Sequence, residues 1–141
     1  MREYLGAVLC IGLLAAPVAS QAGALEWIEQ AYDRFNAEAG YSNESANDWF
    51  AGRVNQGNAW IVNFTPQQSG RFRFVGACDS DCSTFRVTVL DFRGTDVARQ
   101  IGYSGSTTTY AYLAAGQAYR IQYYPEDCDA PWCYVVGAIY D

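Results

Sequence analysis

Residues 48–141 alternate between apolar and polar side chains in short runs, and Gly-containing turns separate these runs. In the run 71–77, Phe72 and Phe74 alternate with Arg71 and Arg73. Such a period of two is typical of a β-strand that buries one face. The pattern predicts eight strands, at 48–54, 59–65, 71–77, 84–91, 97–103, 107–113, 118–124 and 132–140.

The spacing of these strands predicts the fold class. Short strands that recur about every 10 residues, with tight turns between them, are typical of an antiparallel sandwich or barrel. No helical pattern separates consecutive strands, whereas a parallel sheet needs helical crossovers. We therefore predict one mainly β domain over residues 48–141, built from eight antiparallel strands.

Before the strands, the apolar period changes from two residues to between three and four. Leu25, Ile28, Tyr32, Phe35 and Ala39 recur at these spacings, with charged and amide side chains between them. This pattern predicts an amphipathic helix over 24–39, which the following glycine ends. Its apolar stripe needs a partner surface. We expect the sheet to supply it, and docking on another protein is the alternative.

The first 20 residues have the pattern of a secretory signal peptide. A basic start is followed by an almost unbroken apolar run over 5–16 and then by small residues. This run is shorter than the roughly 20 residues that span a membrane. We predict a signal peptide over 1–20, cleaved after Ser20 or Ala22, and export to the periplasm or the medium. Cleavage also removes Cys10 and leaves no membrane attachment.

The composition limits the chemistry that the folded chain can perform. The chain contains no His and no Lys, and its formal net charge is −6. Ser-His and Cys-His hydrolases, Schiff-base enzymes and His-ligated metal sites are therefore excluded. An acidic chain without a basic stripe also argues against nucleic acid or an anionic membrane as partner.

Four cysteines follow the predicted cleavage site: Cys78, Cys82, Cys128 and Cys133. An even number in a small exported domain predicts two disulfides. We favour the pairs Cys78 with Cys82 and Cys128 with Cys133, because each pair brackets a short loop. Cross-pairing between the loops stays open, and a four-Cys zinc site suits an oxidising compartment less well.

The two cysteine-containing loops are expected at the same end of the domain. In an antiparallel order, the loop after the third strand and the loop after the seventh leave the sheets on the same side. Both loops are rich in carboxylates, which are the ligands that Ca²⁺ prefers, and calcium is the one cofactor we consider. The alternative is that these acids are solvated loop residues. The predicted calcium ligands are Asp79, Asp81, Asp127 and Asp129, with Glu126 beside them.

Aromatic residues gather in the C-terminal half and supply a second candidate surface. Flat rings on a sheet can stack on sugars or dock a protein, although cross-strand pairing that stabilises the sheet is the alternative. Tyr123, Tyr124 and Trp132 are the candidate ligand-binding residues. The whole cluster consists of Tyr103, Tyr110, Tyr112, Tyr123, Tyr124, Trp132 and Tyr134.

The central stretch also resembles a known family. The segment Cys-Asp-Ser-Asp-Cys at 78–82, the following strand with its Asp-Phe-Arg-Gly turn at 91–94, and the two later cysteines resemble small exported bacterial proteins related to prepeptidase C-terminal domains. The resemblance covers roughly 49–140. It implies a jelly-roll-like sandwich and a non-catalytic role in secretion, adhesion or calcium-linked stability. Relatives often have acidic residues where this chain has Thr84 and Arg86, which weakens the calcium implication.

These observations predict a mainly β, antiparallel eight-stranded jelly-roll-like sandwich with one N-terminal amphipathic helix. Its expected function is that of an exported, non-enzymatic binding or accessory module without catalytic residues. We expect it to contact a protein or glycan at the end of the domain where the two carboxylate-rich loops lie. The chain is expected to be a monomer. One alternative is a carbohydrate-binding module that uses surface Tyr and Trp. The other is a hydrolase in which two carboxylates act as acid and base.

Overall fold

The computed structural model describes residues 18–40 and 46–141, without the side chains of residues 18–22 and 24. The predicted signal peptide lies outside these residues except for 18–20, which begin a helix, and Cys10 lies outside them as well. Within the described ranges, no helix is both long and apolar enough to cross a membrane.

Eight strands form the body of the molecule, and each agrees with its predicted bounds to within one residue at either end. All the strand pairs are antiparallel. The alternation of apolar and polar residues was therefore sufficient to locate every described strand. The strands are β1 (Asp48–Asn55), β2 (Trp60–Phe64), β3 (Gly70–Cys78), β4 (Phe85–Leu90), β5 (Asp96–Gly102), β6 (Ser106–Leu113), β7 (Tyr119–Pro125) and β8 (Trp132–Tyr140).

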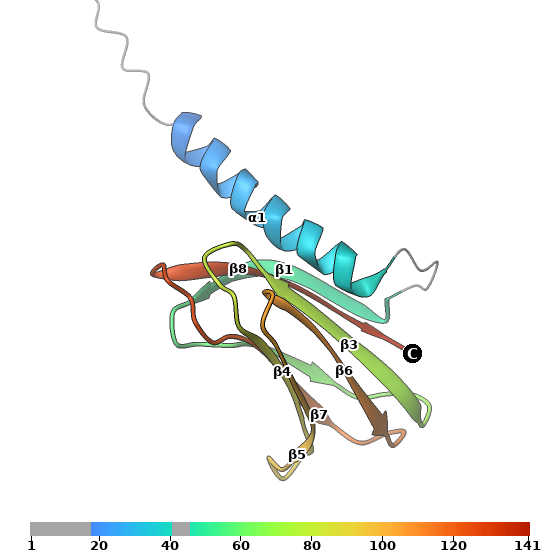
Figure 1. The fold of residues 1–141 in the computed structure, drawn as a ribbon. Coiled ribbons are helices and arrows are strands. Elements are labelled where there is room, and N and C mark those ends of the chain that lie inside the picture. Colours follow the sequence, from blue (N-terminus) through green and yellow to red (C-terminus); the bar gives the residue numbers. More distant parts are fainter. Residues whose placement is uncertain (1–17, 41–45) are drawn as a thin grey trace, which may run out of the picture.

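The strands form two four-stranded sheets that pack face to face (Figure 1). The first sheet has the order β1-β8-β3-β6 and the second the order β2-β7-β4-β5. Of the consecutive strands, only β4 and β5 are neighbours in one sheet, and every other connection crosses to the opposite layer. This is the strand order of a jelly roll. The predicted fold class is therefore confirmed.

The main core fills the space between the two sheets, and two glycines shape its centre. Gly76 of β3 lies opposite Gly137 of β8. A Cβ atom on Gly76 would lie 2.8 Å from the ring of Tyr123, and one on Gly137 would lie 2.9 Å from it. The missing side chains therefore leave the space that this ring fills. Fully buried core residues include Phe74, Phe85, Val87, Val89, Leu113, Ile121, Tyr123 and Val135.

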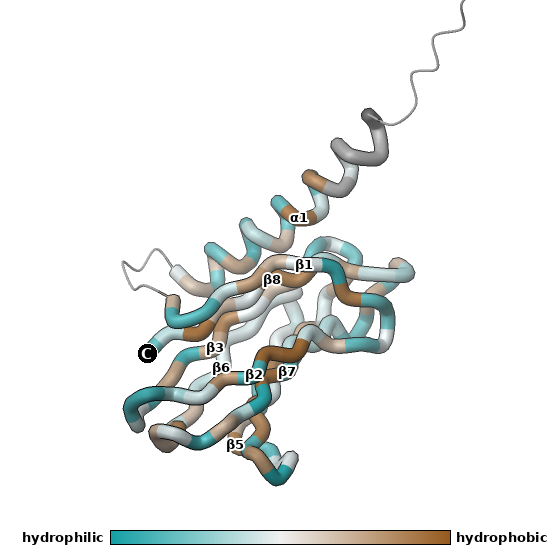
Figure 2. The backbone as a smooth tube through the Cα atoms, turned by 180° about the vertical axis from the view of Figure 1, so that it is seen from behind, coloured by the Kyte–Doolittle hydropathy of each residue, from teal (hydrophilic) through white to brown (hydrophobic). Residues whose placement is uncertain are grey.

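The helix α1 (Val18–Ala39) packs on the outer face of the first sheet, mainly over β3 and β8 (Figures 1 and 2). It ends at Gly40, whose φ of 72° is the left-handed conformation of a helix C-cap, and whose amide donates to the carbonyl of Asn36 at 3.0 Å. The helix and the sheet share a second apolar core, which consists of Ala31, Phe35, Ala39, Val75, Ala77, Val136, Ala138 and Tyr140.

The buried stripe of α1 differs from the predicted one. Leu25 and Tyr32, both expected in the contact, are 63% and 45% exposed. Ala31, which the predicted stripe omitted, is completely buried. The reason lies in the sheet, whose outer face carries small Val and Ala side chains at the contact. A helix that approaches such a flat surface closely presents alanine there and turns its larger apolar side chains toward the margins.

Arg34 fixes α1 to the loop that follows β3. Its Nη1 atom donates to the carbonyl oxygens of Cys78, Asp79 and Cys82, at 3.2, 2.6 and 2.8 Å. Space for this guanidinium depends on Gly105, because a Cβ atom at that position would collide with it. A charged donor satisfies three backbone acceptors at once, which makes this contact stronger than a neutral hydrogen bond.

Two more polar contacts lie four residues to either side of Arg34 on the same face of the helix. The Oε1 atom of Gln30 accepts a hydrogen bond of 2.7 Å from the hydroxyl of Ser80. The carboxylate of Glu38 accepts bonds of 3.0 and 2.9 Å from the hydroxyls of Ser106 and Thr108. The polar side chains at positions 30, 34 and 38 therefore form a second contact stripe beside the apolar one.

Candidate functional site

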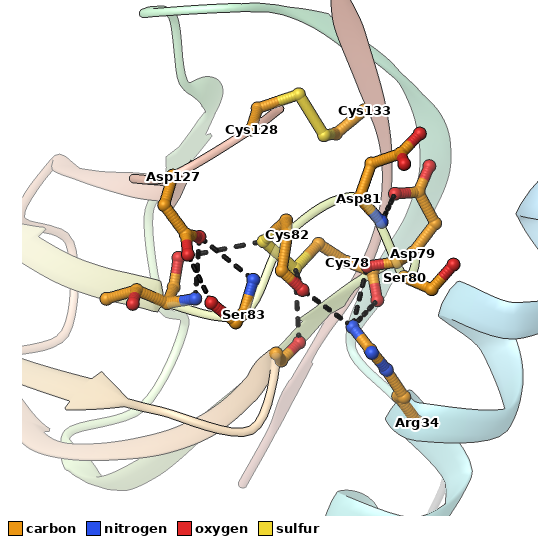
Figure 3. The surroundings of a disulfide bond; sticks show 12 residues. Arg34, Cys78, Asp79, Ser80, Asp81, Cys82, Ser83, Asp127, Cys128 and Cys133 are labelled. Atoms are coloured by element: carbon orange, nitrogen blue, oxygen red, sulfur yellow. Dashed lines mark hydrogen bonds between the residues drawn. A yellow bond between two sulfur atoms is a disulfide. The ribbon is translucent and has the colours of Figure 1, made fainter. Parts of the chain in front are cut away.

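The two disulfide loops, 78–82 and 128–133, lie side by side at one end of the sandwich, the disulfide pole (Figure 3). The amide of Asp129 donates to the carbonyl of Asp81 across the two loops at 2.9 Å. The two loops therefore lie at the same end of the domain. This was predicted because both loops follow odd-numbered strands in an antiparallel order. Two disulfides indicate an oxidising, extracytoplasmic compartment. The favoured pairing is confirmed: Cys78–Cys82 and Cys128–Cys133, each with Cα atoms 6.0 Å apart.

Asp79 lies in the first loop, where its side chain accepts hydrogen bonds and is 1% exposed. Its Oδ1 atom accepts from the amide of Asp81 at 3.0 Å, and its Oδ2 atom accepts from the amide of Tyr134 at 2.8 Å. Burial raises the pKa of Asp79, although the two amides and Arg34 act in the opposite direction. Asp79 therefore joins the first loop to β8 with both of its oxygens.

Asp127 has a similar structural role on the other side of the first loop. Its Oδ1 atom accepts from the amides of Ser83 and Thr84 at 2.9 and 2.7 Å, and its Oδ2 atom accepts from the hydroxyl of Ser83. Burial alone would raise the pKa of Asp127, but these hydrogen bonds outweigh it and hold the pKa below its ordinary value. Its neighbour Glu126 forms an ion pair with Arg86 at 2.8 Å.

The four predicted calcium ligands do not converge on one point. Asp79 and Asp81 lie together on one side of the first loop, and Asp127 lies on the other side (Figure 3). Asp129 is exposed on the second loop. Calcium takes six to eight oxygen ligands, and the described residues contain no group of three Asp, Glu, Cys or His side chains arranged to hold a metal ion. The predicted calcium site therefore has no support in this geometry.

The structure corrects the prediction that Tyr123 contacts a ligand. This side chain is 0% exposed and lies in the core above the two glycines of β3 and β8. Its hydroxyl donates to the carbonyl of Ala138 at 3.5 Å, and burial raises its pKa. The alternation along β7 already placed this position on the inner face. Tyr123 is therefore a packing residue.

The other two predicted ligand-binding residues are accessible and stack with arginine. The guanidinium of Arg86 lies 4.8 Å from the ring centroid of the half-buried Tyr124. Trp132 is 41% exposed, and the guanidinium of Arg53 lies 4.6 Å from its ring centroid. The two residues lie on different sheets, so they do not form one surface. Further exposed rings of the predicted cluster are Tyr103 after β5, and Tyr110 and Tyr112 on β6.

A cavity of about 270 Å³ lies at the disulfide pole, where α1 meets the two loops. Aromatic side chains of Trp27, Trp132 and Tyr134 line it. Asp81 adds a half-buried carboxylate, to which no described residue donates a hydrogen bond. The cavity therefore combines flat apolar rings with one available acceptor. The remaining wall residues are Gly23, Asp79, Ala130 and Pro131.

Trp27 is the wall residue that the sequence patterns did not identify. It lies four residues before Ala31, on the stripe that continues through Phe35 to Ala39. The predicted stripe began at Leu25 and passed through Ile28 and Tyr32, so it left out Trp27 and Ala31. A stripe with a constant spacing of four would have included Trp27, so the signal was present in the sequence.

Other hollows, among them the following two, lie away from the pole. One of about 460 Å³ is at the opposite end of the sandwich, where Asn47, Gln67, Gln68 and Asp141 surround an apolar floor. The other, of about 300 Å³, is a groove between α1 and the edge strand β1, lined by Ile28, Tyr32, Trp49 and Ala51, with two exposed helix carboxylates. Neither contains a residue of the predicted site.

A pair of carboxylates that acts as acid and base needs both members in contact with the substrate. Of the two carboxylates in the cavity wall, Asp79 is 1% exposed and accepts backbone hydrogen bonds with both oxygens. Asp81 alone presents an available carboxylate there. The arrangement therefore gives no support to the hydrolase alternative.

No protein-family model matches the chain, and none of the curated proteins is similar to it. The resemblance to prepeptidase C-terminal domains therefore stays a prediction.

Proposed function

We propose that this chain is an exported, non-enzymatic binding module that holds its ligand at the disulfide pole. The observation that carries the proposal is the cavity that Trp27, Trp132, Tyr134 and Asp81 line together. Rings with a few well-placed polar groups are the usual lining of a ligand pocket. The role agrees with the non-catalytic function that the resemblance to prepeptidase C-terminal domains implies.

The rigidity of the wall also favours a binding role. The Cys128–Cys133 disulfide holds the loop that leads into Trp132, and the Arg34 contact holds the helix that carries Trp27. Asp79 ties the first loop to β8 at Tyr134. Because the wall is fixed before the ligand arrives, binding costs little conformational entropy.

The proposed location is the periplasm or the medium, after removal of a signal peptide. Support comes from the apolar run at 5–16, followed by small residues, and from the two disulfides. A chain recovered from the periplasm of a bacterial host is expected to begin at residue 21 or 23. N-terminal sequencing checks this, and recovery of the uncleaved chain in the cytoplasm would contradict it.

The exported chain is then titrated with a library of small fragments, both neutral and charged, in two-dimensional NMR. Four tryptophans give four indole N–H signals, which Trp-to-Phe variants assign. Fragments that bind are expected to shift the signals of Trp27 and Trp132 in a saturable manner, while the signal of Trp49, which lines the α1–β1 groove, serves as control. Fragments that map only to other surfaces would overturn the proposed site.

A second candidate function is carbohydrate binding on the outer face of the first sheet. Tyr110 and Tyr112 lie two residues apart on β6, and they are 50% and 74% exposed. Arg71 stacks on the ring of Tyr110 at 4.3 Å and adds a donor for sugar hydroxyls. In the same titration, sugar fragments that shift these tyrosines and leave Trp27 and Trp132 unchanged would favour this surface.

A further inference from the structure

We propose that the ligand of the cavity at the disulfide pole is an organic ammonium group, such as a trimethylammonium group. Its positive charge would lie beside the Asp81 carboxylate and against the rings of Trp27, Trp132 and Tyr134. This inference rests on the proposed function, because it names the chemical class that the same cavity binds. Three properties of the wall lead to it.

The first property is the sign of the charge. The charged side chains in the wall, Asp79 and Asp81, are both carboxylates. Both oxygens of Asp79 are occupied by backbone amides, whereas no described residue donates to the Asp81 carboxylate. The nearby Arg34 is held by three carbonyl oxygens. The exported chain then has to begin at residue 21, because cleavage after Ala22 would turn Gly23 of the wall into an N-terminal ammonium group. A half-buried carboxylate without such a cation attracts a positively charged ligand.

The second property is the chemistry of the rings. The faces of Trp and Tyr attract cations within about 6 Å of the ring centroid, and Trp does so most strongly. Trp132 already shows this behaviour, because the guanidinium of Arg53 lies 4.6 Å from its ring centroid. Arg53 is exposed and does not line the cavity. The wall therefore offers an ammonium group aromatic rings and, in addition, a negatively charged carboxylate.

The third property is size. The cavity volume of about 270 Å³ is near the lower limit of the range in which drug-sized ligands bind. A compact head group fits such a volume better than an oligosaccharide. A neutral sugar would also need several hydrogen-bond partners, and the wall supplies few of them. Five of its eight residues are glycine, apolar or tryptophan, namely Gly23, Trp27, Ala130, Pro131 and Trp132.

The test compares choline chloride with 3,3-dimethyl-1-butanol, in which carbon replaces the ammonium nitrogen and removes the charge. The exported chain is titrated with each compound while the indole N–H signals are followed, and NaCl keeps the ionic strength constant. Choline is expected to shift the signals of Trp27 and Trp132, with a dissociation constant in the millimolar range. The neutral isostere is expected to bind at least about tenfold more weakly, a difference of about 1.4 kcal/mol.

Matched variants separate the charge from the rings. Asp81→Asn is expected to weaken choline binding about tenfold, whereas Asp129→Asn removes the same charge from the neighbouring loop and is expected to change it less than about twofold. Trp132→Ala is expected to abolish the shift, and Trp49→Ala is its control in the α1–β1 groove. Circular dichroism and the melting temperature of each variant confirm that it is folded.

The outcomes distinguish this inference from the proposed function. Equal binding of choline and its isostere, or choline binding that Asp81→Asn leaves intact, would overturn the ammonium assignment. Binding of a neutral sugar at Trp27 and Trp132 without any choline binding would overturn it too, and would leave the binding module in place. Vesicles of phosphatidylcholine form a further arm: pelleting of the chain with them, reversed by choline, would place the group on a lipid, and binding of free choline alone would place it on a soluble compound.

Discussion

The two disulfide loops resemble each other in sequence but are held very differently. In the first loop only Ser80 is exposed, and Arg34 occupies three of the loop's carbonyl oxygens. In the second loop, residues 129, 131 and 132 are exposed. Its main support from outside the pole is Gln56, whose side chain donates to the carbonyl of Cys128 at 2.8 Å.

This difference shows that neighbouring elements, and not the cysteine motif itself, decide what such a loop does. The first loop connects α1, β3 and β8, and it acts as a junction of the fold. The second loop stays at the surface and forms one side of the cavity. Pairs of cysteines with intervening acids therefore predict a bridge, but they do not predict whether the bridged loop connects several elements of the fold or stays at the surface.

The largest expected effect is the removal of each disulfide in turn. Replacement of Cys78 and Cys82 by alanine is expected to lower the free energy of unfolding by about 3–5 kcal/mol, because the carbonyls that bind Arg34 lose their fixed positions as well. Replacement of Cys128 and Cys133 is expected to cost about 2 kcal/mol. Urea unfolding measures both values. A larger loss for the second pair would reverse the comparison.

The next effect concerns the arginine that holds the first loop. Arg34→Met keeps the length of the side chain but leaves three carbonyl oxygens without their charged donor. The expected loss in free energy of unfolding is about 1.5–3 kcal/mol. Arg53→Met is the matched control, since Arg53 is exposed and stacks on Trp132, and its expected loss is below about 1 kcal/mol. Similar losses in the two variants would show that the first loop does not depend on α1.

The smallest effect is a pH dependence in which the two acids of the pole have opposite signs. The pKa of Asp127 is lower in the folded state than in the unfolded chain, so its stabilisation is present above about pH 4 and is lost as pH falls through the folded-state pKa. The pKa of Asp79 is raised, so its contribution favours the fold below about pH 4 and declines as pH rises through the folded-state pKa.

Asp127→Asn tests this sign directly. Urea unfolding at a series of pH values between about 2 and 6 is expected to show a smaller acid-induced loss of stability in the variant than in the unmodified chain. At neutral pH the variant is expected to be less stable by about 1 kcal/mol, because an amide replaces a carboxylate that accepts three hydrogen bonds. Asp129→Asn serves as control. An unchanged acid profile in Asp127→Asn would contradict the assignment.

The sequence predicted those features that depend on neighbouring positions. Alternation located the strands, because each strand buries one face, and short spacing selected the disulfide partners. Because both disulfide loops follow odd-numbered strands, the antiparallel order placed them at the same end. The Asp91 turn is also local: Asp91 accepts from the amides of Arg93 and Thr95, and Gly94 has a φ of 81°, as expected for an Asp that caps a turn.

The sequence did not predict those features that depend on distant partners. Apart from the amide of Asp81, the amides that donate to the carboxylates of Asp79 and Asp127 come from Tyr134, Ser83 and Thr84. Those of Tyr134 and Ser83 lie 55 and 44 residues away. Nothing near these acids in the sequence distinguishes them from Asp81, whose carboxylate stays available. The calcium hypothesis treated all of them as equivalent. Likewise, the helix face depends on the flat Val and Ala surface of the sheet, which the helix sequence does not contain.

The strand order has a consequence for how the chain reaches its folded state. β1 pairs with β8, the last strand of the chain, and α1 packs on residues of β8 as well. The first strand therefore lacks its pairing partner, and α1 lacks part of its packing surface, until β8 is available. Contacts between such distant segments close large loops, which slows folding. We therefore expect the pairing of β1 with β8 to be a late step, in which the first sheet is completed after the strands closer together in the sequence have met.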